Sequence, residues 1–325
     1  MVKLAYILAA SHSGSTLLSI LLGSHPQIAT IGEMKLSRKA MGDLASYRCS
    51  CGEFIRQCRF WHKVKECMVD RGFEFDLAYA GTDYSAFESR YARRLLGPLY
   101  RGKFLENFRD FALGLSPTWV KQFPEIHRRN AALVSTVLEI TKAETIVDSS
   151  KNALRLKYLL RNPELDVTVI HLIRDGRAVA LTYMDPAEFA DAQNPSMRGG
   201  GMGGDRENER LSMAQAAYQW RRCNEEAENI LCCLDRSRWI EVRYEQICTD
   251  PDATLKRIWL FLDVNSSLAV KDFRSIEQHV VGNGMRLDTT SEIRLDERWR
   301  EVLSERDLRI FHDVAGEMNR QYGYE

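Results

Sequence analysis

The chain has 325 residues, with 45 basic and 45 acidic side chains and a formal net charge of zero. This balance argues against a nucleic-acid coat protein and against a polybasic membrane anchor. Hydrophobic residues at 45% and charged residues at 28% exclude wholesale disorder. The length suits one large α/β domain or two small ones, with a sizeable core.

The apolar start of the chain, Met1–Ala10, has the look of a secretory signal. It is short, carries one lysine and passes directly into a Ser/Gly loop, so we predict a buried strand there instead. The sequence has no run of about eighteen uninterrupted apolar residues and therefore predicts no membrane span. We expect a cytoplasmic protein without membrane or nucleic-acid partners.

Short apolar runs alternate with helix-like segments along the chain. The predicted strands cover residues 3–9, 144–148, 167–173 and 239–243. The predicted helices cover residues 15–22, 152–161, a stretch from about 176, and about 208–235. A Gly-rich loop covers residues 198–204. Strands that alternate with helices predict a central parallel sheet. We therefore expect one domain over residues 1–325, with a mainly helical insertion at about 36–140.

The first predicted strand is followed by a small-residue turn and a helix, which is the arrangement of an anion-binding loop. Residues 9–16 fit the frame of the ATP-binding loop, G-x4-G-K-[ST], but Ala9 replaces the first glycine and Ser15 replaces the lysine. That lysine normally reaches the β- and γ-phosphates. The pattern predicts a P-loop-NTPase-like, three-layer α/β/α fold whose loop binds a differently built anion; a plain strand-to-helix turn is the alternative.

Further segments extend this pattern in chain order. Ser13–Leu18 is followed by Gly32-Glu33, and the run Ile173–Val179 contains Arg174, which Thr182 follows eight residues later. Additional matches are His25-Pro26, Tyr244–Gln246, Asp250-Pro251, Gly282–Arg286 and Tyr322–Tyr324. Together they resemble the sulfotransferases that use 3′-phosphoadenosine 5′-phosphosulfate (PAPS), nearest to the tyrosylprotein-sulfotransferase-like branch. The resemblance implies in-line sulfuryl transfer to a hydroxyl or amine of a small-molecule acceptor, with no metal required.

The resemblance also implies catalytic residues. Glu33 matches the family's general base, and Lys151 matches the lysine that stabilises charge on the leaving group. The phenol and steroid branch uses a histidine two residues after that lysine, and this chain has Ala153 there. His12 stands where relatives carry Lys or Arg, and as an imidazolium it could act as a general acid. Each residue also has a non-catalytic alternative: Glu33 as a solvated carboxylate, Lys151 as a lysine at a helix start, and His12 as a neutral histidine in a turn.

A larger set is expected to bind the nucleotide. The loop residues should hold the 5′-phosphosulfate, Arg174 and Thr182 the 3′-phosphate, and three C-terminal residues are weaker candidates for the same ligand. The set is Ser11, Ser13, Gly14, Ser15, Thr16, Leu17, Arg174, Thr182, Tyr244, Arg286 and Arg294.

Three of the eight cysteines cluster in the sequence. Cys49, Cys51 and Cys58 are followed by His62, and three thiols with an imidazole could hold zinc. A C-x-C pair is tighter than the usual C-x2-C spacing, so reduced or regulatory thiols are the competing interpretation.

Two other functions stay open at this stage. A P-loop kinase would need a phosphate-reaching lysine, which the loop lacks, and a strand-end aspartate for Mg²⁺, for which Asp148 is a candidate. A catalytically inactive nucleotide-binding protein is the second alternative, with the His12 substitution as its support. The expected partners are a small-molecule acceptor and, as an open alternative to a monomer, a second copy of the chain.

Overall fold

A computed structural model describes residues 1–325 except 37–43, 46, 86–88, 97–101, 190–209 and 271. Five parallel strands form its central sheet, in the order β2-β3-β1-β4-β5. The strands are β1 Val2–Ala9, β2 Ile28–Thr30, β3 Thr145–Lys151, β4 Leu165–Ile173 and β5 Trp239–Arg243. The Gly-rich loop predicted at 198–204 lies outside the described residues.

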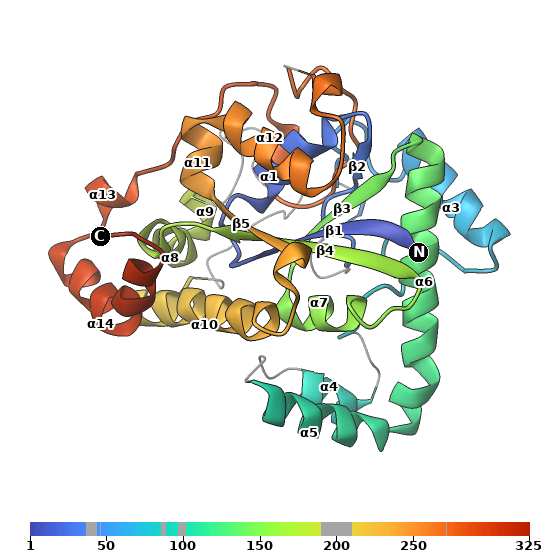
Figure 1. Ribbon diagram of the computed structural model, residues 1–325, viewed down its shortest axis with the longest axis horizontal. Helices are drawn as coiled ribbons and strands as arrows, with labels where there is room; N and C mark the ends of the chain where they lie inside the picture. The colour runs from blue at the N-terminus through green and yellow to red at the C-terminus, as the bar shows by residue number, and fades with distance from the viewer. Residues whose placement is uncertain (37–43, 46, 86–88, 97–101, 190–209, 271) are drawn as a thin grey trace.

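Helices cover both faces of this sheet. Figure 1 shows α1, α11 and α12 on one side of the strands and α7 and α10 on the other. The helices nearest the sheet and the C-terminus are α1 Ser15–Gly23, α7 Ala153–Leu159, α8 Gly176–Met184, α9 Pro186–Phe189, α10 Met213–Leu231, α11 Tyr244–Thr249, α12 Pro251–Phe261, α13 Trp299–Val302 and α14 Glu305–Gln321. The expected three-layer α/β/α fold is confirmed.

The alternation of side chains along β1 explains the two cores. Leu4, Tyr6 and Leu8 point into one hydrophobic cluster, whereas Ala5 and Ile7 point into another, on the opposite face. These residues are at most 1% exposed. A central parallel strand is buried on both faces, which is why its sequence is a continuous apolar run.

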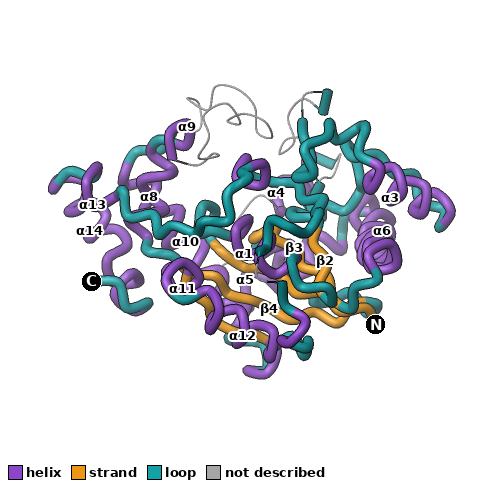
Figure 2. The backbone as a smooth tube through the Cα atoms, turned by 90° about the horizontal axis from the view of Figure 1, so that it is seen from above, coloured by secondary structure: helices purple, strands orange, loops and turns teal. Residues whose placement is uncertain are grey.

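The helical stretch predicted at about 36–140 contains α3 Arg59–Asp70, α4 Arg90–Leu96, α5 Lys103–Gly114 and α6 Pro117–Thr141. Helix α6 contacts β1, β2 and β3, and its side chains share a hydrophobic cluster with β1. Figure 2 shows α3 and α6 together at the β2 side of the sheet, with α8, α13 and α14 at the other side. Within the described residues, no helix is long and apolar enough to cross a membrane.

Two differences from the predicted elements affect the site. The short strand β2, beside β3, was not predicted. Strand β3 runs on to Lys151 instead of ending at Asp148, so Lys151 ends a strand and does not start a helix. Helix α7 begins after it, with the Asn152 side chain accepting from the backbone N–H of Arg155.

A buried carboxylate joins these elements. Asp148, fully buried in β3, accepts from Arg155 Nε at 2.9 Å. Its other oxygen accepts from the N–H groups of Met34 at 3.1 Å and Ser150 at 2.9 Å. Arg155 in turn donates to the Thr82 carbonyl and to Asn130 Oδ1. Asp148 therefore fixes the loop after β2 against the end of β3.

Replacing Asp148 with Asn should destabilise the protein strongly, because the Arg155 guanidinium would stay buried without its counter-charge. Loss of one partner of a buried pair typically costs about 3–5 kcal/mol. Denaturant titration would measure the free energy of unfolding. Asp252→Asn, at an exposed position of α12, is the matched control and should change it by about 0.5 kcal/mol or less. Equal unfolding midpoints for the two variants would contradict this role.

Candidate functional site

The loop between β1 and α1 is a turn that leads into the uncapped start of α1. Gly14, at φ 88°, precedes α1, and no side chain caps the helix. A Cβ on Gly14 would lie 2.4 Å from Cδ2 of Tyr244, so only glycine fits there. The uncapped first turn leaves backbone N–H groups directed out of the helix. Ser15, Thr16 and the backbone of Leu17 lie in this turn.

The buried Ser13 hydroxyl is evidence for a ligand at this loop. Ser13 is 1% exposed, yet its Oγ has no hydrogen-bond partner among the described residues. A buried hydroxyl without a partner carries a desolvation cost that a ligand oxygen would remove. Together with the uncapped helix end, it fits the loop to an anion.

Glu33 and Lys151 form an ion pair beside this loop. Lys151 Nζ lies 2.5 Å from Glu33 Oε1 and also donates to the Ser149 carbonyl at 3.2 Å. An ammonium group has three N–H donors, and within the described part of the chain only two of those of Lys151 are used, which leaves the third for a ligand. Both side chains are largely but not fully covered, 15% and 27% exposed for Lys151 and Glu33.

Glu33 of this pair and Thr16 of the loop both lie close to Gly282. A Cβ placed on Gly282 would stand 3.8 Å from Glu33 Oε1 and 4.0 Å from the Thr16 hydroxyl. Glu33 and Thr16 therefore approach the same point of the backbone. The candidate base and the candidate anion-binding loop therefore meet at Gly282.

Two of the candidate catalytic residues have left-handed backbones. His12 and Lys151 both have φ 67°, a region that residues other than glycine rarely adopt. Such conformations persist where the surrounding structure holds them, and they cluster at functional sites. The His12 ring packs edge-on against Tyr183, with the ring centroids 4.8 Å apart.

Arg174, at the end of β4, is 6% exposed and anchored on several sides. Its Nη1 donates to the His12 carbonyl at 2.8 Å, and its guanidinium lies 4.3 Å from the centre of the Tyr244 ring. Its Nη2 lies 2.9 Å from a carboxylate oxygen of Asp296, while Nε has no partner among the described residues. Tyr244 thus underlies both Gly14 and Arg174.

Asp296 is a residue that the sequence reasoning missed. Burial raises its pKa, but the hydrogen bond from Arg298 and the charge of Arg174 outweigh burial and leave the pKa well below its usual range. Asp296 is therefore an anion that occupies Arg174. Thr182, which was expected to bind the 3′-phosphate together with Arg174, is buried in α8 and donates to the Ala178 carbonyl at 3.1 Å.

The remaining C-terminal candidates are placed differently. Arg286 is 1% exposed and its guanidinium donates to the carbonyls of Arg48, Gly282 and Asn283, so it holds backbone segments together. Arg294 is exposed and paired with Glu292 at 2.6 Å. On the other side of the loop, Ser11 hydrogen-bonds with Tyr183.

The cysteines are brought together, but with another histidine. Cys49, Cys51 and Cys58 cluster with His279, which lies far along the chain. His62, the predicted fourth member, instead hydrogen-bonds through Nε2 to the Arg56 carbonyl at 2.7 Å. No spacing rule in the sequence points to His279, because 221 residues separate it from Cys58.

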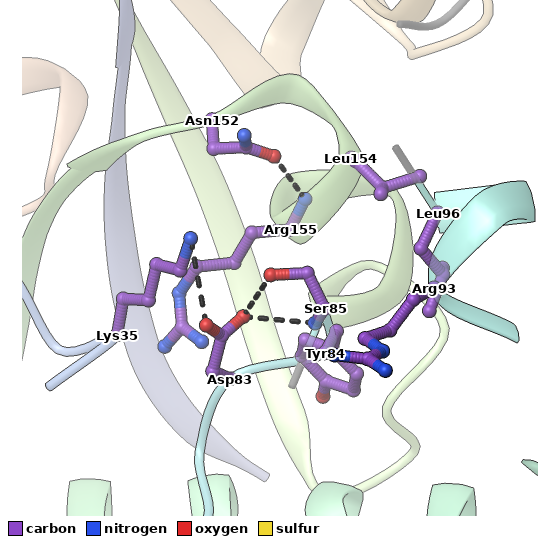
Figure 3. A pocket seen from close by; sticks show the side chains of 9 residues that line it. All are labelled: Lys35, Asp83, Tyr84, Ser85, Arg93, Leu96, Asn152, Leu154 and Arg155. Carbon is purple, nitrogen blue, oxygen red and sulfur yellow. Dashed lines mark hydrogen bonds and ion pairs between the residues drawn. The ribbon is translucent and has the colours of Figure 1, made fainter. Parts of the chain in front are cut away.

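A pocket of about 330 Å³ lies next to the Glu33–Lys151 pair along the chain. Figure 3 shows Lys35 directed at Asp83, 3.5 Å away, and Ser85 bonded to the same carboxylate. Its lining residues are Lys35, Asp83, Tyr84, Ser85, Arg93, Leu96, Asn152, Leu154 and Arg155. Charged and hydroxyl groups in the lining suit a polar ligand.

Comparison with known proteins assigns the chain. Over 143 residues it is 29% identical to carbohydrate sulfotransferase 2 of Mus musculus and of Homo sapiens; the match covers 35% of this chain but only 26% of those relatives. A sulfotransferase from Mycobacterium avium aligns with 100% of this chain and 78% of its own at 12% identity and a TM-score of 0.47. The sulfotransferase domain of a Synechococcus olefin synthase aligns with 99% and 95% at 15% identity and 0.44. The family model described as "Sulfotransferase family" matches residues 5–267. This match covers most of the chain and includes the loops that follow β1 and β4. The chain therefore belongs to the sulfotransferase family.

Proposed function

We propose that this protein transfers the sulfuryl group of PAPS to a hydroxyl or amine of a small-molecule acceptor by in-line displacement. The observation that carries the proposal is the meeting of the Glu33–Lys151 pair with the anion-binding loop at Gly282. The partnerless Ser13 hydroxyl and the uncapped start of α1 fit a 5′-phosphosulfate. Arg174 lies across the loop, on the His12 carbonyl, and is the residue to receive the 3′-phosphate.

The bound nucleotide would supply a sulfuryl group that is already activated for transfer. The protein then has to remove a proton from the acceptor and stabilise charge on the leaving oxygen. Glu33 Oε1 is the site for the acceptor's proton, and the third N–H of Lys151 is the donor to the leaving oxygen. Lys151 can move from Glu33 toward the nucleotide, and this movement would free the carboxylate to act as base.

The acceptor site that we propose is the pocket of Figure 3. Two of its lining residues are sequence neighbours of the reacting pair: Lys35 follows Glu33 by two residues, and Asn152 follows Lys151 directly. Its polar lining favours an acceptor rich in hydroxyl groups. The likeness to carbohydrate sulfotransferase 2 supports a sugar hydroxyl as the first acceptor to try. Assignment to the tyrosylprotein-sulfotransferase-like branch stays a prediction from Gly32-Glu33 and the Arg-Asp-Gly-Arg run.

The kinase alternative loses its second requirement. Asp148 is fully buried, and both its oxygens accept hydrogen bonds from protein groups. It is therefore poorly suited to hold Mg²⁺. The inactive-binder alternative is tested by turnover, as described below for Glu33.

Nucleotide preference tests the proposed co-substrate. We expect 3′-phosphoadenosine 5′-phosphate to bind much more tightly than ADP or ATP, without Mg²⁺, because Arg174 would receive the 3′-phosphate, which ADP and ATP lack, and because the loop has no lysine for a γ-phosphate. Calorimetry with each nucleotide, with and without EDTA, measures this. Equal affinity for ADP, or affinity that depends on metal, would count against the proposal.

Glu33→Gln tests the base. It keeps the shape and the contact with Lys151 but removes basicity, so kcat should fall about 10²–10⁴-fold. The Kd of 3′-phosphoadenosine 5′-phosphate should change little. The assay is PAPS consumption across sugars, alcohols, phenols and amines. Glu164→Gln, an exposed carboxylate before the amino end of β4, is the control and should keep full activity. Full turnover by Glu33→Gln would move attention to His12.

Arg174 and Asp296 should act in opposite directions. Arg174→Ala removes a charge-assisted contact and should weaken the 3′-phosphorylated nucleotide by about 2–4 kcal/mol while leaving ADP nearly unchanged. Asp296→Asn removes the anion that competes for Arg174 and should tighten the same nucleotide. Calorimetry on both variants measures the shifts. If ADP and the 3′-phosphorylated nucleotide weaken together in Arg174→Ala, Arg174 is structural.

A further inference from the structure

Four potential metal ligands converge at the edge of the helical insertion. The Sγ atoms of Cys49, Cys51 and Cys58 and a ring nitrogen of His279 all lie within 4.8 Å of one another. Cys58 Sγ lies 3.8 Å from Cys51 Sγ and 3.3 Å from His279 Nδ1, and Cys49 Sγ lies 3.7 Å from the same nitrogen. Cys49 and Cys58 are fully buried.

These separations are those of a tetrahedral site. With Zn–S bonds of about 2.3 Å and a Zn–N bond of about 2.0–2.1 Å, tetrahedral geometry puts sulfurs about 3.8 Å apart and a sulfur and nitrogen about 3.6 Å apart. The three individual distances given above are within a few tenths of an ångström of these values, and the remaining pairs, all within 4.8 Å, would close by at most about 1 Å when the ion binds. Three thiolates and one imidazole are the soft donor set that selects zinc over the hard cations.

The local fold prearranges the donors. Cys49 N–H donates to the Glu53 carbonyl at 2.9 Å, and Gly52, at φ 89°, closes the turn between them. This turn brings Cys49 and Cys51 to one side. Cys58 stands directly before α3 as its N-terminal flanking residue.

His279 is fixed from two sides. Its ring stacks on Phe60, with centroids 4.4 Å apart and planes 4° from parallel. Its Nε2 lies 3.7 Å from a carboxylate oxygen of Glu277, while Nδ1 faces the thiols. A small rotation of the exposed Glu277 side chain would bring its carboxylate within hydrogen-bond distance of Nε2–H, which would select the tautomer with a free lone pair on Nδ1.

We propose that Cys49, Cys51, Cys58 and His279 bind one zinc ion as a closed structural site. Four protein ligands leave no position for water or substrate, so the ion would have no part in the transfer chemistry. Each thiol gives up its proton as its sulfur binds, so metal binding releases protons. A disulfide between Cys51 and Cys58 is the competing chemistry for the same atoms.

The site would join two segments that build the active site. His279 is close in sequence to Val281, whose carbonyl accepts from the Glu33 N–H at 3.3 Å, and to Gly282. On the hairpin side, the Tyr47 hydroxyl accepts from the Gly282 N–H at 2.8 Å. Zinc would clamp the hairpin of residues 47–55 to the backbone that positions Glu33.

Metal analysis of the full chain tests the site. Purified protein should contain about one zinc per chain by inductively coupled plasma mass spectrometry, and Cys58→Ser and His279→Asn should reduce the zinc to background. His62→Gln and Cys232→Ser, which alter a histidine and an exposed cysteine outside the cluster, should keep it. His62→Gln also separates the two candidate histidines directly.

A second set of measurements uses the wild-type chain, so its results do not depend on whether a variant folds. Cobalt exchanged into the protein should show intense d–d bands of a tetrahedral ion and thiolate-to-cobalt charge transfer. A thermal melt after zinc is removed by a chelator should show a lower Tm. Wild-type protein free of zinc that fails to take up cobalt, or a Cys51–Cys58 disulfide found by peptide mass spectrometry in metal-free native protein, would overturn the proposal. These readouts do not depend on sulfuryl transfer.

Discussion

The buried carboxylate of Asp148 is the constraint on which the site depends. It sits at the end of a central strand, where it binds the Arg155 side chain and the Met34 backbone. An unpaired charge there would be very costly, so each of these contacts is held firmly. Because Met34 follows Glu33 directly, the same carboxylate that neutralises Arg155 also places the candidate base beside Lys151.

The functional charges of this protein are neutralised within the chain. Lys151 is paired with Glu33, and Arg174 is paired with Asp296. At Lys151 and Arg174, an incoming polyanion would therefore exchange these ion pairs for new ones. In the proposed mechanism, this exchange would moderate the affinity for the nucleotide and couple nucleotide binding to the release of Glu33 from Lys151. The proposed zinc site would keep Gly282 and the Glu33 loop together while these pairs rearrange.

Much of the fold follows from local sequence. The strands predicted at 3–9 and 167–173 agree with the structure within a few residues, because central parallel strands buried on both faces are largely apolar runs. The strand predicted at 239–243 also agrees, although it lies at the edge of the sheet and mixes apolar with charged residues. β2, with three residues, is too short to show a pattern. β3 extends to Lys151 because its last residues pair with β1. These residues, 148–151, are polar, so the apolar pattern of the sequence does not indicate this part of the strand.

The sequence by itself determined the family, since the two strand-end segments keep their order and spacing. It also determined the loop residues and Glu33, Lys151 and Arg174 as candidates, because short motifs carry them. Only the tertiary structure decided what each candidate touches. Asp296 as the partner of Arg174, and His279 in place of His62 among the cysteines, arise from contacts between segments more than a hundred residues apart. Local periodicity has no information on such contacts, because packing of the whole chain creates them.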